Sequence, residues 1–131
     1  MKRDMSLIRE LLLELESMPG NEVFSFTQHR EAWGGRNADA EVSVEGYTPA
    51  QIAYHLSLLK EIGFIESPEG SPPPIGIMFG GLTWAGHAYL DAVRNPDIWR
   101  KTKEGAEAAG GFTVDILRDL AKGFIKTLLS G

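Results

Sequence analysis

The stretch that decides the fold runs from Thr48 to Leu90. It reads TPAQIAYHLSLLKEIGFIES at 48–67, continues through a Pro-rich turn, and resumes as IGIMFGGLTWAGHAYL at 75–90. The segment begins with a capping box, Thr48 to Gln51, which has proline at the first helical position and predicts a helix from Pro49 to Ile62. Gly63 can end that helix in a left-handed conformation. The stretch therefore predicts a helix, a hairpin and a second helix.

The predicted helix at 49–62 has one apolar face and one mixed face. At 100° per residue, Ile52, Leu56 and Leu59 share a stripe that we expect to be buried. His55 lies at the boundary of this stripe. The side chains expected on the opposite face are Ala50, Gln51, Tyr54, Ser57, Leu58 and Glu61.

Two short strands are predicted after this helix, at Phe64 to Glu66 and at Ile75 to Phe79. The sequence between them, SPEGSPPP at 67–74, cannot be helical because its prolines remove backbone donors and clash with a preceding turn. We expect this hairpin to project from the domain as a wing.

The chain before Thr48 begins with an amphipathic helix over Asp4 to Met18, whose apolar residues recur at spacings of three and four. Asp4 is placed to cap this helix, and Pro19-Gly20 to end it. Further on, Val23 to Phe26 and Val42 to Val44 read as two strands of a hairpin with a long connection. A short helix near residues 28–32 is the competing interpretation.

Three helices are predicted after the hairpin. Thr83 caps one that runs to about Arg94, Asn95-Pro96 opens another that Gly110-Gly111 closes, and Thr113 caps the last. We predict a single domain over residues 1–131, with a core at 1–94 and a helical extension at 95–131, in a mainly helical α+β class. The last helix has a broad apolar stripe formed by Leu117, Leu120, Ala121, Phe124, Ile125 and Leu128.

Composition limits the classes of function. The chain has 131 residues, 43% of them hydrophobic, which suits one domain with a core of its own. No run approaches the roughly 18 apolar residues of a membrane span, and acidic residues interrupt the N-terminal MKRDMSLIRELLLELES. There is no cysteine, and we expect a cytoplasmic protein that does not bind membranes. The net charge of -5 argues against a general nucleic-acid binder.

Two resemblances follow from these motifs. Leu59 and the run from Gly63 to Glu66, followed by Leu82, Thr83 and Gly86, resemble the LxxxGLIE and LTxxG elements of bacterial winged-helix regulators. Nearly the whole chain looks like an uncharacterised family of small bacterial and prophage-encoded proteins. The resemblance implies a winged-helix-like fold. A standard winged-helix domain would have a further helix between the first strand and residue 48. The resemblance implies no biochemical activity.

A DNA-binding role would use the predicted helix at 49–62 as a recognition helix. Gln51, Tyr54, His55 and Ser57 would then face base edges or phosphates. From Thr48 to Leu82, however, Lys60 stands against Glu61, Glu66 and Glu69, a local net charge of -2. Basic contacts would come from outside this stretch, and the candidates are Arg118, Lys122 and Lys126 on the last helix. An ordinary solvated helix face is the simpler interpretation of these residues.

A protein-binding role rests on Tyr54 and Leu58, which lie four residues apart and form an apolar ridge on the outward side. Either the hairpin or the last helix covers this ridge within one chain, or a partner does. The broad apolar stripe of the last helix also has two possible partners: another part of the same chain, or a second copy in a dimer. We predict a noncatalytic module that binds protein or associates with itself, a host- or phage-directed adaptor, with a winged-helix transcriptional regulator as the alternative.

No motif predicts an enzyme. The three histidines, His29, His55 and His87, lack metal-ligand spacing. His87 and Asp91 are four residues apart and could share a metal, but a hydrogen-bonded or exposed pair is the simpler interpretation. Trp33, Trp84 and Trp99 are expected in the core or in packing between subdomains. We therefore predict no catalytic residue, metal ion or cofactor.

Overall fold

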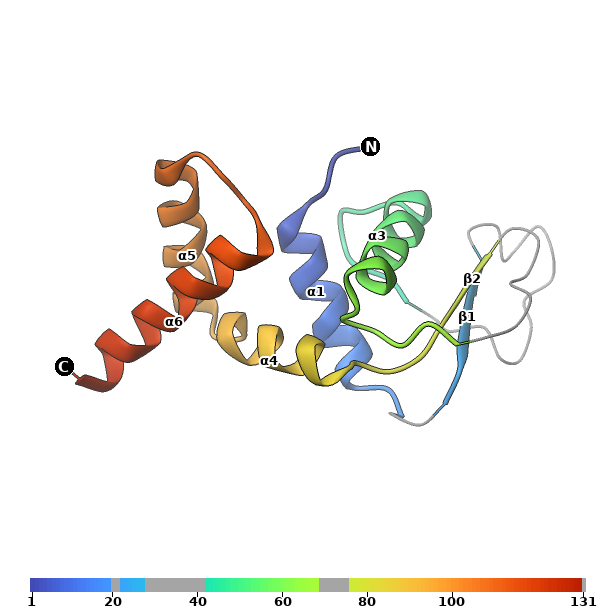
Figure 1. Ribbon diagram of the computed structural model, residues 1–131. Coiled ribbons are helices and arrows are strands. Elements are labelled where there is room, and N and C mark those ends of the chain that lie inside the picture. Colours follow the sequence, from blue (N-terminus) through green and yellow to red (C-terminus); the bar gives the residue numbers. More distant parts are fainter. Residues whose placement is uncertain (20–21, 28–41, 69–75, 131) are drawn as a thin grey trace. The chain divides into compact units, whose positions relative to one another are not determined.

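The computed structural model describes residues 1–19, 22–27, 42–68 and 76–130 (Figure 1). The described part of the chain is mainly helical, with a small antiparallel sheet. It divides into two compact units, Met1–Gly86 and His87–Gly131, and the division falls within a helix. The single domain over residues 1–131, with a core at 1–94 and a helical extension at 95–131, stays a prediction. The described elements are α1 (Met5–Glu16), β1 (Phe24–Thr27), α3 (Pro49–Ile62), β2 (Gly76–Phe79), α4 (Trp84–Val93), α5 (Pro96–Ala109) and α6 (Val114–Ser130).

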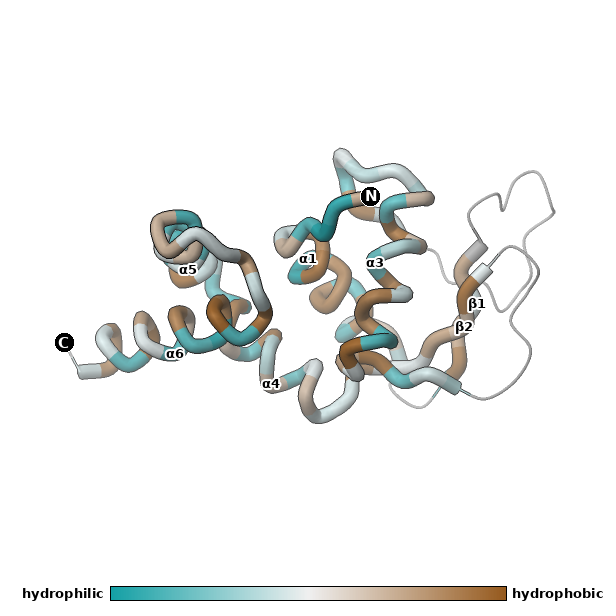
Figure 2. Tube along the Cα trace, turned by 45° about the horizontal axis from the view of Figure 1, so that its top comes forward, coloured by the Kyte–Doolittle hydropathy of each residue, from teal (hydrophilic) through white to brown (hydrophobic). Residues whose placement is uncertain are grey.

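Hydrophobic and hydrophilic residues alternate along helix α1 of the first unit (Figure 2). Leu7, Leu11 and Leu12 are fully buried. The Asp4 carboxylate caps the helix, because its Oδ1 accepts the backbone N–H groups of Ser6 and Leu7 at 2.9 and 3.1 Å. The cap is therefore confirmed. The helix ends at Glu16, two residues earlier than the apolar spacing predicted.

Helix α3 has the predicted bounds and both predicted caps. The Thr48 hydroxyl accepts the Gln51 N–H, and the Gln51 side chain accepts the Thr48 N–H, so the capping box is complete. Gly63 ends the helix with a φ of 81°. The predicted stripe of Ile52, Leu56 and Leu59 is buried, and α3 packs against α1 and β2.

The sheet corrects the predicted strand pairing. β1 pairs antiparallel with β2, in a register that runs from Phe24 opposite Phe79 to Thr27 opposite Gly76. Residues 42–44 form no strand, so the hairpin between Val23–Phe26 and Val42–Val44 was wrong. The observed pairing buries the side chains of Phe26 and Phe79. The prediction missed it because it paired the two strands that are neighbours in the sequence. The alternative helix near 28–32 lies outside the described residues.

The predicted hairpin is present in reduced form. β2 confirms the second strand over Gly76–Phe79, while Ile75 lies outside the described residues. The first strand, predicted over Phe64–Glu66, is reduced to one bridge between Ile65 and Leu82. Beside it, the Glu66 N–H donates to the Gly81 carbonyl, and the Gly80 N–H donates to the Glu66 carbonyl. Of the predicted wing turn, the structure describes Ser67 and Pro68.

The start of α4 lies against the end of α3 in the first unit. The Thr83 hydroxyl accepts the Gly86 N–H, as predicted for a cap, and donates to the Gly63 carbonyl. Gly86 lies so close to the Phe64 backbone that a Cβ atom on it would be 2.1 Å from the Phe64 oxygen. A glycine is therefore required where α4 begins.

The second unit contains the helical hairpin of α5 and α6. Asn95 caps α5, Gly110 ends it with a φ of 84°, and the Thr113 hydroxyl accepts the Ile116 N–H at the start of α6. All three end signals are confirmed. The two helices approach closely at Gly105, where a Cβ atom would lie 3.4 Å from the Leu120 side chain.

Candidate functional site

The outward face of α3 is the predicted recognition surface. Tyr54 and Leu58 are half-buried, so the ridge that they were expected to form is partly accessible. The Tyr54 ring packs edge-on against the His55 ring, with centroids 5.5 Å apart. Ser57 is exposed, and its hydroxyl donates to the Ala53 carbonyl at 3.3 Å. This face therefore presents an anchored aromatic ring and one aliphatic side chain.

Two of the residues predicted to contact bases make hydrogen bonds within the chain instead. The Gln51 side chain belongs to the capping box, where its Oε1 lies 2.8 Å from the Thr48 nitrogen. His55 was placed at the edge of the buried stripe, but it is buried, with 1% of its surface exposed. Neither residue is placed to read bases, because one serves the helix end and the other faces the interior.

The hydrogen bonds of His55 determine its tautomer. Nε2 lies 2.8 Å from the Asp4 backbone nitrogen, which can only donate, so Nε2 is the acceptor. Nδ1 lies 2.7 Å from the Gln51 carbonyl oxygen and therefore carries the proton. A neutral imidazole thus joins the N-terminus of α1 to the first turn of α3.

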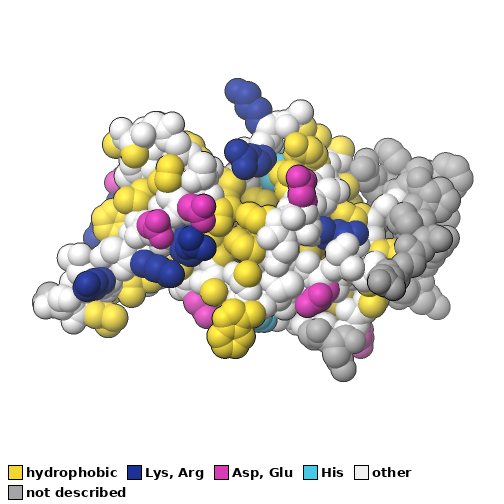
Figure 3. Space-filling model, viewed as in Figure 1, with side chains coloured by type: hydrophobic (Ala, Val, Ile, Leu, Met, Phe, Trp, Pro, Cys, Tyr) yellow, Lys and Arg dark blue, Asp and Glu magenta, His cyan; other side chains and the backbone are white. Residues whose placement is uncertain are grey.

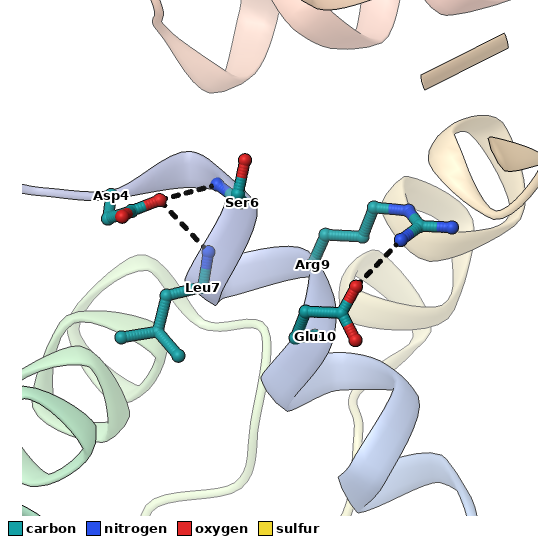
Figure 4. Close-up of polar contacts among 5 residues, drawn as sticks. All are labelled: Asp4, Ser6, Leu7, Arg9 and Glu10. Carbon is teal, nitrogen blue, oxygen red and sulfur yellow. Dashed lines mark hydrogen bonds and ion pairs between the residues drawn. The ribbon is translucent and has the colours of Figure 1, made fainter. Parts of the chain in front are cut away.

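Asp4 is the centre of this polar cluster. Its Oδ1 caps α1 by accepting the Ser6 and Leu7 N–H groups (Figure 4), and its Oδ2 accepts the Tyr47 hydroxyl at 2.8 Å. Burial, together with the hydrogen bond and negative charge of Asp4, raises the pKa of Tyr47 to about 12. Lys2 and Arg3 precede this anchored residue and are exposed. The tertiary structure therefore brings two cations toward the start of α3, which no sequence spacing indicated.

A groove lies between α3 and β2, and it shares Ser57 with the outward face. Its volume is about 440 Å³. Ser57, Lys60 and Glu61 line it from α3, and Ser67, Gly76 and Ile77 line it from the hairpin. The groove carries one positive and one negative side chain, so its lining has no net charge of its own.

The two units differ in charge. The sequence of the first unit has 6 Lys and Arg against 12 Asp and Glu, a net charge of -6; that of the second has 7 against 6, a net charge of +1. The unit that carries α3 is therefore strongly acidic, which opposes binding to a polyanion.

The predicted basic contacts lie on α6, in the other compact unit. Arg118 binds Asp115 at 2.9 Å and approaches Asp119 at 3.8 Å, so its charge is compensated locally. Lys122 and Lys126 are exposed and have no ion-pair partner within the described ranges. Only these two of the three predicted contacts keep an available charge.

The sequence suggested that the tryptophans are buried, but the structure leaves one of them exposed. Trp99 is buried, with the Lys103 ammonium 5.7 Å from its ring centroid. Trp84 is 90% exposed, and Trp33 lies outside the described residues. Helical periodicity explains Trp84, since it lies 200° around α4 from the buried Gly86. That signal was present in the sequence and was outweighed by the usual burial of large aromatics.

No arrangement for metal binding or membrane spanning is found among the described residues. They include no group of three acidic or histidine side chains placed to hold a metal ion. The Asp91 carboxylate binds Arg94 at 3.0 Å, within its own turn of helix. None of the helices in the described ranges combines the length and apolar character needed to cross a bilayer.

Comparison with known proteins gives a family and one relative. Residues 2–112 match the model of a family described as Hypothetical protein (DUF2513). The chain is 30% identical over 132 residues to an uncharacterised protein of Haemophilus influenzae strain Rd, and the match covers 99% of this chain and 100% of that relative. No solved structure matches the chain.

Proposed function

Since the chain belongs to the DUF2513 family, which brings no reaction with it, we propose from its surfaces that it is a noncatalytic protein-binding adaptor built on a winged-helix-like unit. The element order and the pairing of the strand before α3 with the strand after it support the winged-helix-like assignment. A bacterial or prophage adaptor and a cytoplasmic location remain part of the proposal.

The outward face of α3 carries the protein-binding proposal. Tyr54 and Leu58 are partly accessible, and beside them lies the groove of about 440 Å³ between α3 and β2. An aromatic anchor beside a groove is typical of surfaces that bind a partner's peptide segment or helix. The lining supplies hydroxyl groups from Ser57 and Ser67 and one charge of each sign, which suits a polar peptide with an apolar anchor.

The same geometry weakens the DNA-binding alternative. Gln51 and His55 make intramolecular hydrogen bonds, and the unit that carries them has a net charge of -6. One observation favours DNA nonetheless, because the Asp4 contact with His55 brings the exposed Lys2 and Arg3 toward the start of α3. A transcriptional regulator therefore stays the second candidate.

Affinity capture from the native cytoplasm, with and without nuclease, separates the two candidates. The protein-binding proposal expects partners that survive nuclease, are lost with Tyr54→Ala, and are kept with Phe112→Ala. Phe112 is a matched control because it is an exposed aromatic residue in the other unit. If the recovered proteins disappear with nuclease, or are the same for both variants, the proposal fails.

Direct titration with duplex DNA tests the second candidate. A regulator would bind duplex at low salt, lose affinity as salt rises, and bind more weakly after Lys2→Ala and Arg3→Ala. Absence of duplex binding at low salt would exclude it.

A further inference from the structure

The described residues include two exposed apolar surfaces besides the ridge of Tyr54 and Leu58, one in each unit. The first, the Trp84 surface, consists of Trp84 and Ile62, which are 90% and 47% exposed. They belong to one region, because Thr83 bonds the Gly63 carbonyl directly after Ile62. The second, the α6 end, consists of Leu128 and Leu129, which are 67% and 82% exposed. Apolar side chains this open are typical of contact sites when they are clustered.

Two glutamates adjoin the residues of the Trp84 surface, one along the chain and one across the Ile65–Leu82 bridge. Glu61 precedes Ile62 in α3, and Glu66 lies beside Gly80 and Gly81, shortly before Trp84. Both carboxylates belong to exposed residues, and neither is ion-paired to any residue that the structure describes. A partner for this surface therefore has to present apolar groups together with cations.

The α6 end has the complementary character. Lys122, Lys126 and Leu129 follow one another at spacings of four and three, so they share one side of the helix. Figure 3 shows Lys and Arg side chains along α6, and hydrophobic side chains toward its C-terminal end. Arg118 is already held by Asp115, so the unpaired positive charge is concentrated next to the exposed leucines.

We propose that a second copy of this chain is the occupant: the Trp84 surface of one copy receives the Leu128–Leu129 end of α6 from the other, and the exchange is reciprocal. The apolar groups bury one another, while Lys122 and Lys126 lie against Glu61 and Glu66 of the neighbouring copy. Reciprocity forms the same contact twice, which a small interface needs to approach the area of a stable dimer. The contact uses neither Tyr54 nor Leu58, although Ile62 follows Leu58 by one turn of α3 and Glu61 also lines the groove beside them.

Sedimentation velocity and light scattering of the full chain over a wide concentration range test the proposal. At low salt we expect a reversible dimer of about twice the 14.4 kDa chain mass. Raising the salt concentration weakens it by screening the charges. Trp84→Ala and the double variant Leu128→Ser, Leu129→Ser each weaken association at least tenfold, because tryptophan and buried apolar anchors dominate such contacts.

Two kinds of control separate the contact from general surface effects. Phe112→Ser removes an exposed apolar side chain, 43% exposed, from the second unit before α6 begins, and should leave dimerisation unchanged. The double variant Lys122→Glu, Lys126→Glu should dissociate the dimer, and combining it with Glu61→Lys, Glu66→Lys should restore it. Thermal unfolding checks that each variant keeps its fold.

Mixing the two apolar variants distinguishes exchange from like-with-like pairing. The Trp84→Ala chain keeps an intact α6 end, and the double leucine variant keeps an intact Trp84 surface, so the mixture can form one native contact and associates more strongly than either variant alone. A monomeric wild-type chain at every concentration would overturn the proposal. So would a Trp84→Ala chain that dimerises normally, or a mixture that behaves as two monomers.

Discussion

Asp4 makes hydrogen bonds to three parts of the first unit through its side chain and its backbone N–H. It caps α1, accepts the Tyr47 hydroxyl, and presents its backbone N–H to His55. The capping role was legible because Asp4 precedes an apolar repeat. The contacts with Tyr47 and His55 were not, since they join residues 43 and 51 positions apart, which only folding brings together.

Tyr47→Phe tests this cluster by the pH dependence of stability. The pKa of Tyr47 rises from 10.0 to about 12 on folding, so the folded protein holds the phenol proton more tightly than the unfolded chain. The resulting stabilisation is complete below pH 10 and is lost as the pH rises from about 10 to about 12. After allowance for solvent screening, we expect this difference to be roughly 1 kcal/mol.

The measurement is denaturant unfolding of wild type and Tyr47→Phe from neutral to alkaline pH. Wild type should be the more stable at neutral pH, because the variant lacks the hydrogen bond to Asp4. The gap should narrow above pH 10. A gap that stays constant across the alkaline range would contradict the assigned role.

At the level of elements, helix ends were the most predictable features. Capping depends on residues three or four positions apart, so the bounds of α3 followed directly from Thr48, Gln51 and Gly63. Strand pairing was less predictable. Val23–Phe26 and Val42–Val44 are compatible with many partners, and burial of Phe26 and Phe79 selected β2 instead.

Thr48→Ala tests the capping box. The variant loses the acceptor for the Gln51 N–H, and unfolding should cost about 1 kcal/mol less than in wild type. Thr127→Ala, within the exposed part of α6, serves as the matched control and should change stability little. Equal effects of the two substitutions in chemical denaturation would rule out a special role for the box.

Gly86→Ala tests the contact between the start of α4 and the backbone at Phe64. A Cβ atom at Gly86 would lie 2.1 Å from the Phe64 oxygen, so backbone has to move, and we expect a loss of roughly 3 kcal/mol or more. At Gly123, a Cβ atom meets nothing within 4 Å, so Gly123→Ala should stabilise α6 by about 0.5–1 kcal/mol. In thermal unfolding, we expect Gly86→Ala to lower the stability and Gly123→Ala to raise it. A Gly86→Ala variant as stable as wild type would contradict the close approach.

At the scale of the whole molecule, charge is divided unevenly between the units. The chain as a whole carries -5, but the first unit carries -6 and the second +1. This asymmetry gives the α3-bearing unit an unfavourable field for DNA, and gives the second unit its locally basic helix. It is one reason why we propose protein partners, including a second copy of the chain, rather than nucleic acid.

Acrylamide quenching of tryptophan fluorescence tests the exposure of Trp84. Trp84 is 90% exposed and Trp99 is buried, so Trp84→Phe should remove a readily quenched part of the emission, and Trp99→Phe should remove a protected part. Quenching of Trp84 should fall as protein concentration rises if a second copy covers it. Equal quenching before and after Trp84→Phe would contradict the open position.

The sequence by itself determined the helices, their caps, the glycine at the end of α3 and the overall acidity, because each depends on neighbouring residues or on composition. Only the tertiary structure decided that β1 pairs with β2, that His55 turns inward to Asp4, and that Trp84 stays outside. Those outcomes depend on which distant surfaces meet, and burial and hydrogen bonding between them select one arrangement from several that local patterns allow equally.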